Sequence, residues 1–132
     1  MRLNEEPRME IGRVTPILRM FDEAKAKEFY IDFLGFTIGF EHRFEPGTPL
    51  YMGISLGGCF IHLSEHHGDA SPGARIRIEC SNVDELQKTL IGKQYKYGRP
   101  GVEDMPWGTR ELHAHDPFGN RLTFFTNQTA GS

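Results

Sequence analysis

Apolar and polar positions along the first part of the chain change from strand-like to helical spacing. Residues 14–21 are apolar apart from Arg19, and Asp22 then precedes apolar positions that recur every three or four residues over 23–34. A period near 3.6 is typical of a helix with one buried stripe. Asp22 is a suitable N-cap and Gly35 a suitable residue just past the helix end. We therefore predict a strand over 14–21 and a helix over 23–34.

Three further strands complete this first unit. Residues 36–44 and 50–56 alternate between apolar and polar side chains, as half-buried strands do, and 59–65 follows as a third strand. Turn residues at 45–47 and a Gly-Gly pair at 57–58 separate these strands. The order is β-α-β-β-β.

The same order returns after a polar loop over 66–73. The caps Asp22 and Asn82 are 60 positions apart, which indicates two copies of one unit. The second copy consists of a strand over 75–80, a helix over 83–91, a short strand over 95–97, an irregular segment over 98–107, and strands over 109–115 and 121–126. A tight turn at Asp116-Pro117-Phe118-Gly119-Asn120 joins the last two strands. We predict one α+β domain over 1–132, with repeats at about 13–65 and 74–127.

Composition places the chain among ordinary globular proteins. Hydrophobic residues make up 38% and charged residues 25% of the 132 residues, and the net charge of −3 argues against nucleic acid as a partner. No apolar run is long enough to cross a membrane, and the polar segment 1–13 lacks the apolar core of a signal peptide. A cytoplasmic location is expected. Cys59 and Cys80 are too few for a disulfide framework, so we interpret both as buried thiols.

Four motifs resemble those of the vicinal oxygen chelate superfamily, which includes glyoxalases, bleomycin resistance proteins and extradiol dioxygenases. They are Phe29-Tyr30-x-x-Phe33-Leu34-Gly35-Phe36, Phe60-Ile61-His62-Leu63, Asn82-Val83-Asp84-Glu85-Leu86 and Asp116-Pro117-Phe118-Gly119-Asn120. The resemblance implies two βαβββ units whose strands form a curled mixed sheet around a cavity, with the helices outside. It also implies a homodimer whose cavities are completed by the partner chain. One such fold hosts many activities.

Metal-dependent relatives hold a divalent ion at four positions, which the motifs place at Thr15, His62, Arg75 and Thr123. Only His62 is an ordinary metal ligand, since threonine hydroxyls bind weakly and the permanent positive charge of Arg75 repels a cation. We therefore predict no cofactor and no inherited metal site. A relocated site for Zn, Ni or Fe stays open as an alternative, because several possible ligands follow His62 in sequence or alternate along the strand 109–115. They are Glu65, His66, His67, Asp69, Glu111, His113 and His115.

Two functions remain open. The first is metal-independent binding, as the resemblance to bleomycin resistance proteins implies: sequestration of a bulky ligand, such as a bleomycin-type glycopeptide, at a dimer interface. Such a site needs aromatic faces and a few polar groups. The candidates are Phe40, His42, Phe44, Tyr51, Phe60, His62, Arg75, Trp107, Glu111 and His113.

The alternative is an enzyme: a glyoxalase-like lyase, isomerase or dioxygenase with a metal near His62, or a catalyst that uses side chains alone. In the latter case His62 is the candidate base, and Arg75 would hold a carboxylate or phosphate with help from Arg110 or Arg19. The plain structural interpretation of Arg75 is an ion pair with Glu79 or Glu111.

Overall fold

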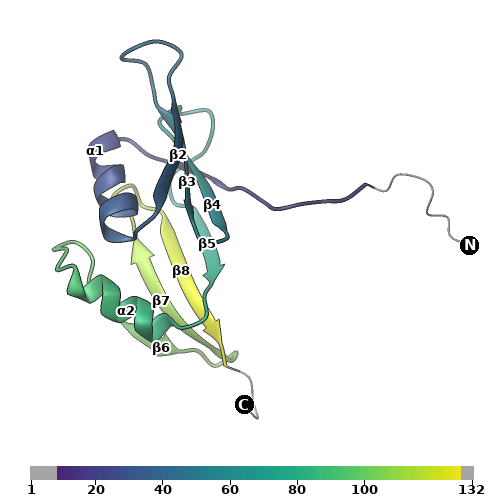
Figure 1. The fold of residues 1–132 in the computed structure, drawn as a ribbon, viewed down its shortest axis with the longest axis vertical. Coiled ribbons are helices and arrows are strands. Elements are labelled where there is room, and N and C mark those ends of the chain that lie inside the picture. The colour runs from purple at the N-terminus through teal and green to yellow at the C-terminus, as the bar shows by residue number, and fades with distance from the viewer. Residues whose placement is uncertain (1–8, 129–132) are drawn as a thin grey trace, which may run out of the picture.

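The chain repeats one order of elements twice, as Figure 1 shows for residues 9–128, the part that this computed structural model describes. The first unit consists of β1 (Ile17–Arg19), α1 (Glu23–Ala26) with the π-helical segment η1 (Lys27–Phe33), β2 (Thr37–His42), β3 (Tyr51–Leu56) and β4 (Cys59–Ser64). The second consists of β5 (Arg75–Glu79), α2 (Val83–Gly92), β6 (Val102–Asp104), β7 (Thr109–His115) and β8 (Arg121–Asn127). The predicted α+β class with two βαβββ repeats is confirmed. The first eight residues of the polar leader and the last four residues of the chain lie outside the described part.

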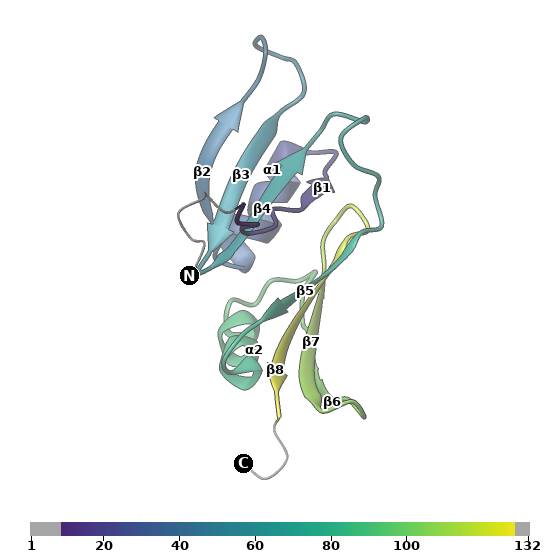
Figure 2. The same ribbon diagram turned by 90° about the vertical axis from the view of Figure 1, so that its right-hand side faces the viewer.

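Each unit forms its own four-stranded mixed sheet. The strand order is β1-β4-β3-β2 in sheet 1 and β5-β8-β7-β6 in sheet 2, and the first strand of each unit runs parallel to the last. In Figure 2, α1 lies behind β3 and β4, so one face of sheet 1 is covered by its helix. We call the other face of each sheet its open face. No helix within residues 9–128 has the length and apolar content needed to cross a membrane.

The helix-covered faces carry the core. On β4, Ile61 and Leu63 are fully buried beneath the first helix, whose Phe29, Tyr30 and Phe33 are also buried. Alternate residues of the same strands therefore point to the open faces. This alternation decides which side chains are free to meet a ligand.

Local chemistry sets the bounds of the first helix. The Asp22 carboxylate accepts a hydrogen bond from the Lys25 backbone N–H at 2.9 Å, and Gly35 ends the helix with a φ of +91°. The predicted helix over 23–34 is confirmed in extent, but its second part is wider than an α-helix. There the Leu34 N–H donates to the Phe29 carbonyl five residues earlier, at 2.9 Å.

The Asp116 turn joins the two units. Its buried carboxylate accepts hydrogen bonds from the Tyr30 hydroxyl at 2.7 Å, the Phe118 N–H at 2.8 Å and the side-chain amide of Asn120 at 2.8 Å. Asn120 also donates to the Arg19 carbonyl of β1 at 2.9 Å. Burial, and then the Asp116 charge, hold the pKa of Tyr30 well above its usual value, so this hydroxyl stays a donor. We call this group the inter-unit joint.

Two predicted strands differ in the structure. The first is shorter than 14–21 because Val14 is 80% exposed, and the described chain before Arg13 extends away from the sheets (Figure 1). The strand expected over 95–97 lies instead at Val102–Asp104. The reason is tertiary: the Tyr95 ring packs on Phe33, which holds residues 95–97 in a turn against the first helix.

A β-bulge at Gly39 changes the register of β2. Ile38 pairs with Ile54, but Phe40 pairs with Gly53, so one extra residue lies in β2 between these pairs. Simple alternation places Ile38 and Phe40 on the same face. The bulge instead moves Phe40 to the open face of sheet 1.

Candidate functional site

The open face of sheet 1 carries three side chains in mutual contact. Phe40, Tyr51 and His62 come from β2, β3 and β4, and the Tyr51 hydroxyl is 2.7 Å from the His62 Nδ1 atom. The Phe40 ring stacks nearly parallel to Tyr51 at 6.2 Å and meets His62 edge-on at 5.2 Å. Phe40 is 44% exposed although its ring reaches over β3, an inner strand of the sheet. These three residues, with His42 and Phe60, form what we call the aromatic face.

Gly53 makes room for the Phe40 ring. A Cβ atom at Gly53 would lie 2.3 Å from the Phe40 Cε1 atom, much closer than real contacts allow. Phe40 therefore lies directly over the backbone of β3. Together the Gly39 bulge and the absent side chain at Gly53 place this ring, and neither feature was predicted from the sequence.

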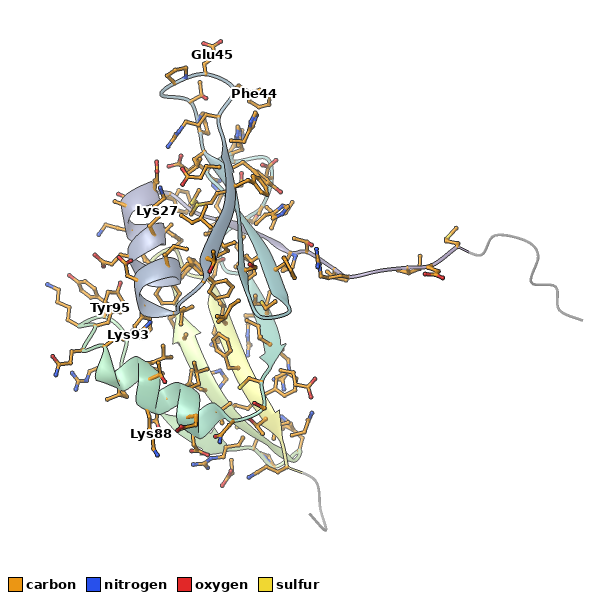
Figure 3. The ribbon with its side chains drawn as sticks, viewed as in Figure 1. Lys27, Phe44, Glu45, Lys88, Lys93 and Tyr95 are labelled. Atoms are coloured by element: carbon orange, nitrogen blue, oxygen red, sulfur yellow. The ribbon has the colours of Figure 1, made fainter. Side chains whose placement is uncertain are left out.

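Further aromatic and cationic groups lie at the two ends of the aromatic face. At one end His42 packs edge-on against Phe44 at 5.0 Å. Phe44 is 77% exposed in the loop that follows β2 (Figure 3) and approaches His66 at 6.1 Å. At the other end the Arg13 guanidinium lies 3.6 Å from the centre of the Phe60 ring. The face thus offers stacking surface along its whole length.

Glu111 is a buried charged group on the open face of sheet 2. It is only 1% exposed, and its Oε2 atom accepts hydrogen bonds from Arg77 at 2.9 Å, Thr109 at 2.6 Å and Trp107 at 3.1 Å. Burial raises the pKa of this carboxyl, but the three donors outweigh burial and hold the pKa at about 2. Glu111 is therefore a fixed anion at neutral pH.

The neighbours of Glu111 make further contacts with one another. The Arg77 guanidinium lies over the Phe125 ring at 4.5 Å, and the His113 Nδ1 atom is 2.8 Å from the Thr123 hydroxyl. The other ring nitrogen of His113 is 3.8 Å from Glu111, which is beyond hydrogen-bond distance. The indole of Trp107 remains 62% exposed while its N–H is held by Glu111.

The sequence candidates thus divide between two sheets. Five of them, Phe40, His42, Tyr51, Phe60 and His62, lie on the open face of sheet 1. Arg75, Glu111 and His113 lie on the open face of sheet 2, and Trp107 lies in the turn that precedes β7.

Two expectations for Arg75 are wrong. The ion pair with Glu111 is formed by Arg77, whose place in the alternating segment Arg-Ile-Arg-Ile-Glu was the signal for its shared face. Arg110 does not assist Arg75, because it points to the helix-covered side and pairs with Asp84 at 3.0 Å and Asp104 at 2.9 Å.

The residues at the superfamily metal positions do not fit a divalent ion. His62 is paired with Tyr51 on sheet 1, Thr123 is bonded to His113 on sheet 2, and Arg75 is a cation. In the part of the chain that the structure describes, no three His, Cys, Asp or Glu side chains come together as possible ligands. Among the loop candidates, Glu65 accepts from the Leu50 N–H at 2.8 Å and Asp69 from the Ser64 hydroxyl at 2.7 Å.

A groove of about 1060 Å³ borders the aromatic face at Phe60. It runs from the turn between β3 and β4 to β5 and the start of α2, and neither His62 nor Arg75 lines it. Cys59 and Cys80 do line it, as free and half-buried thiols rather than the fully buried ones expected. Burial raises the pKa of the Cys59 thiol, which makes it a poor nucleophile.

Comparisons with known proteins agree with this architecture. The bleomycin-binding protein of Streptomyces verticillus, solved with copper(II)-bleomycin, is 27% identical, with 95% of this chain and 100% of that chain covered and a TM-score of 0.66. A bleomycin-binding protein solved with bleomycin is 22% identical over 89% of this chain and 100% of its own, with a TM-score of 0.68. A third structure is that of a member of the glyoxalase/bleomycin resistance protein/dioxygenase superfamily from Sphaerobacter thermophilus. It is 24% identical, with 89% of this chain and 98% of that chain covered and a TM-score of 0.67. A search of curated proteins finds no match.

A family model described as "Glyoxalase superfamily protein" matches residues 5–131. The match spans nearly the whole sequence and includes both βαβββ units. The chain therefore belongs to the glyoxalase superfamily, and it has the fold of the bleomycin-binding proteins within it.

Proposed function

We propose that this protein binds and sequesters a bulky aromatic small molecule without a metal, as a homodimer. The observation that carries the proposal is the aromatic face of sheet 1. Aromatic rings are costly to leave in water, yet Phe40 is held over Gly53 and remains 44% exposed. The bleomycin-binding proteins of the same fold support a ligand of this size.

The site is completed by a second copy. Within residues 9–128 each helix lies on the side of its sheet away from the open face. The strands form two separate sheets rather than one closed barrel (Figure 2). In the proposed dimer, the aromatic face of one protomer meets the open face of sheet 2 of its partner. Trp107 and the Glu111 cluster then lie opposite the stacked rings.

Calorimetric titration with a copper-loaded bleomycin-type glycopeptide tests the proposal. We expect binding in the low micromolar range or tighter, and a loss of at least roughly tenfold in Phe40→Ala, since aromatic anchors contribute this much or more to an interface. Tyr97→Ala is the matched control, because Tyr97 is 68% exposed but lies in the connection between α2 and β6. Sedimentation of the free protein should show a dimer.

Absence of heat at high micromolar concentration contradicts the proposed binding, and sedimentation as a monomer contradicts the proposed dimer. Elemental analysis after dialysis separates it from the enzyme alternative. One divalent ion retained per chain would favour a metal-dependent lyase or dioxygenase and count against metal-independent binding.

A further inference from the structure

The open face of sheet 2 carries two neighbouring arginines without an acidic partner in the described part of the chain, with a histidine beside them. Arg75 of β5, Arg121 of β8 and His115 of β7 are direct neighbours across the three strands, because Arg75 pairs with Arg121 and Arg121 pairs with His115. Their side chains share the open face, since Ile76 and Leu122 point to the core. We call these three residues the arginine row.

The charge of the neighbouring row is balanced. Two residues further along β5, on the same face, Arg77 is neutralised by Glu111 of β7 at 2.9 Å. By contrast, no described carboxylate lies within 4.0 Å of the guanidinium of Arg75 or Arg121. Like charges placed directly opposite one another destabilise a sheet. The arginine row is thus an unfavourable arrangement for the isolated chain.

A bound oxyanion would relieve the repulsion between the two guanidinium groups. A carboxylate or phosphate has several acceptor oxygens, and two neighbouring guanidiniums can donate to it at once through charge-assisted hydrogen bonds. We infer that Arg75 and Arg121 bind an acidic group, a carboxylate or phosphate, of the small molecule that the protein takes up. The inference rests on the proposed function, and it predicts that, among aromatic ligands, those that carry an acid bind more tightly.

Two measurements on the full-length protein test the arginine row, with inorganic phosphate and acetate as probes. The first follows the side-chain Nε–H NMR signals of the arginines during titration. We expect saturable shifts of Arg75 and Arg121 with one or both anions, and roughly tenfold weaker binding in Arg75→Gln or Arg121→Gln, the loss that one charge-assisted hydrogen-bonding group accounts for. Arg99→Gln, at an exposed arginine between α2 and β6, is the matched control and should bind as the wild type does.

The second measurement is thermal unfolding in low-salt buffer. Without anions, Arg75→Gln and Arg121→Gln should each raise the Tm, because the cross-strand repulsion is relieved. Phosphate should raise the Tm of the wild type and of Arg99→Gln but not of the two row variants. If the two arginines had only a structural role, their substitution would lower the Tm measured without anions instead of raising it.

Linear, unsaturated shifts of both arginines with both anions overturn the inference. So does a loss of dimerisation in the row variants without any response to phosphate or acetate, because the row would then bind a carboxylate of the second copy. These outcomes are independent of the titration with the glycopeptide. A protein that binds phosphate through the row but no aromatic ligand supports the anion site and contradicts the proposed sequestration.

Discussion

Glu111 gives a quantitative prediction about stability that needs no ligand. Its carboxyl has an ordinary pKa of 4.5 and a pKa of about 2 in the folded protein, because three donors hold its Oε2 atom. A lowered pKa means that the folded state favours the ionised form. The stabilisation is therefore fully present above pH 4.5 and is lost as the pH falls toward 2.

The magnitude follows from the two pKa values. Each unit of difference corresponds to about 1.4 kcal/mol, so the ionised Glu111 contributes at most about 3 kcal/mol at pH 7 and roughly 2 kcal/mol at pH 3.5. These are upper values, because the side chain of Arg77 is 49% exposed and solvent screens part of its attraction. The replacement Glu111→Gln removes the charge and keeps the side-chain volume.

The assay is urea unfolding of the wild type and Glu111→Gln at pH 7, 5 and 3.5, followed by far-UV circular dichroism. We expect the difference in unfolding free energy between them to narrow by about 1 kcal/mol from pH 7 to pH 3.5. Trp107, the single tryptophan, donates to Glu111, so its fluorescence should differ between the two proteins at pH 7. Glu103→Gln is the control, because Glu103 pairs with Glu111 across the strands but is exposed.

A difference that stays constant or widens as the pH falls refutes this account of Glu111. The account is also refuted if the difference in unfolding free energy between the wild type and Glu103→Gln narrows by the same amount as the pH falls. Either result would mean that the buried hydrogen bonds to Oε2 do not set the ionisation of this carboxyl.

Three further predictions concern the framework. Tyr30→Phe should cost about 1–3 kcal/mol in urea unfolding, because it leaves the buried Asp116 with one donor fewer, and an unchanged midpoint would contradict this. Gly119→Ala should cost about 1–2 kcal/mol, since φ is +92° there, and calorimetry showing an unchanged Tm would count against it. Deletion of Gly39 removes the extra residue, so regular alternation should keep Ile38 on the core face and Phe40 on the open face and the Tm should change little; a large fall in the Tm would show that the bulge itself is needed for this register.

The element order could be predicted because local signals agree with it. Asp22 and Asn82 cap helices, as their hydrogen bonds to following backbone N–H groups show, and the apolar spacing of each strand matches its core face. The assignment of β6 failed because a contact with the distant Phe33 determines the conformation of residues 95–97. Local propensity carries no information about such a contact.

The site could be predicted less completely. Period-two alternation places Tyr51 and His62 on one face, and the structure agrees. Phe40 was a candidate, but its position depends on a one-residue bulge that alternation does not reveal. Likewise Arg75, rather than Arg77, was expected to pair with Glu111, because choosing between two arginines of one face requires the register of β5 against β8.

The inter-unit joint has a consequence for the selectivity of the proposed binding site. In a dimer built from two such chains, the spacing between opposed binding surfaces depends on the angle between the two halves of each chain. Tyr30, Asp116 and Asn120 fix that angle through buried hydrogen bonds that belong to neither surface. Substitutions in the inter-unit joint would widen or narrow the cavity while every residue that contacts the ligand stayed the same. Selectivity could then evolve at positions far from the bound molecule.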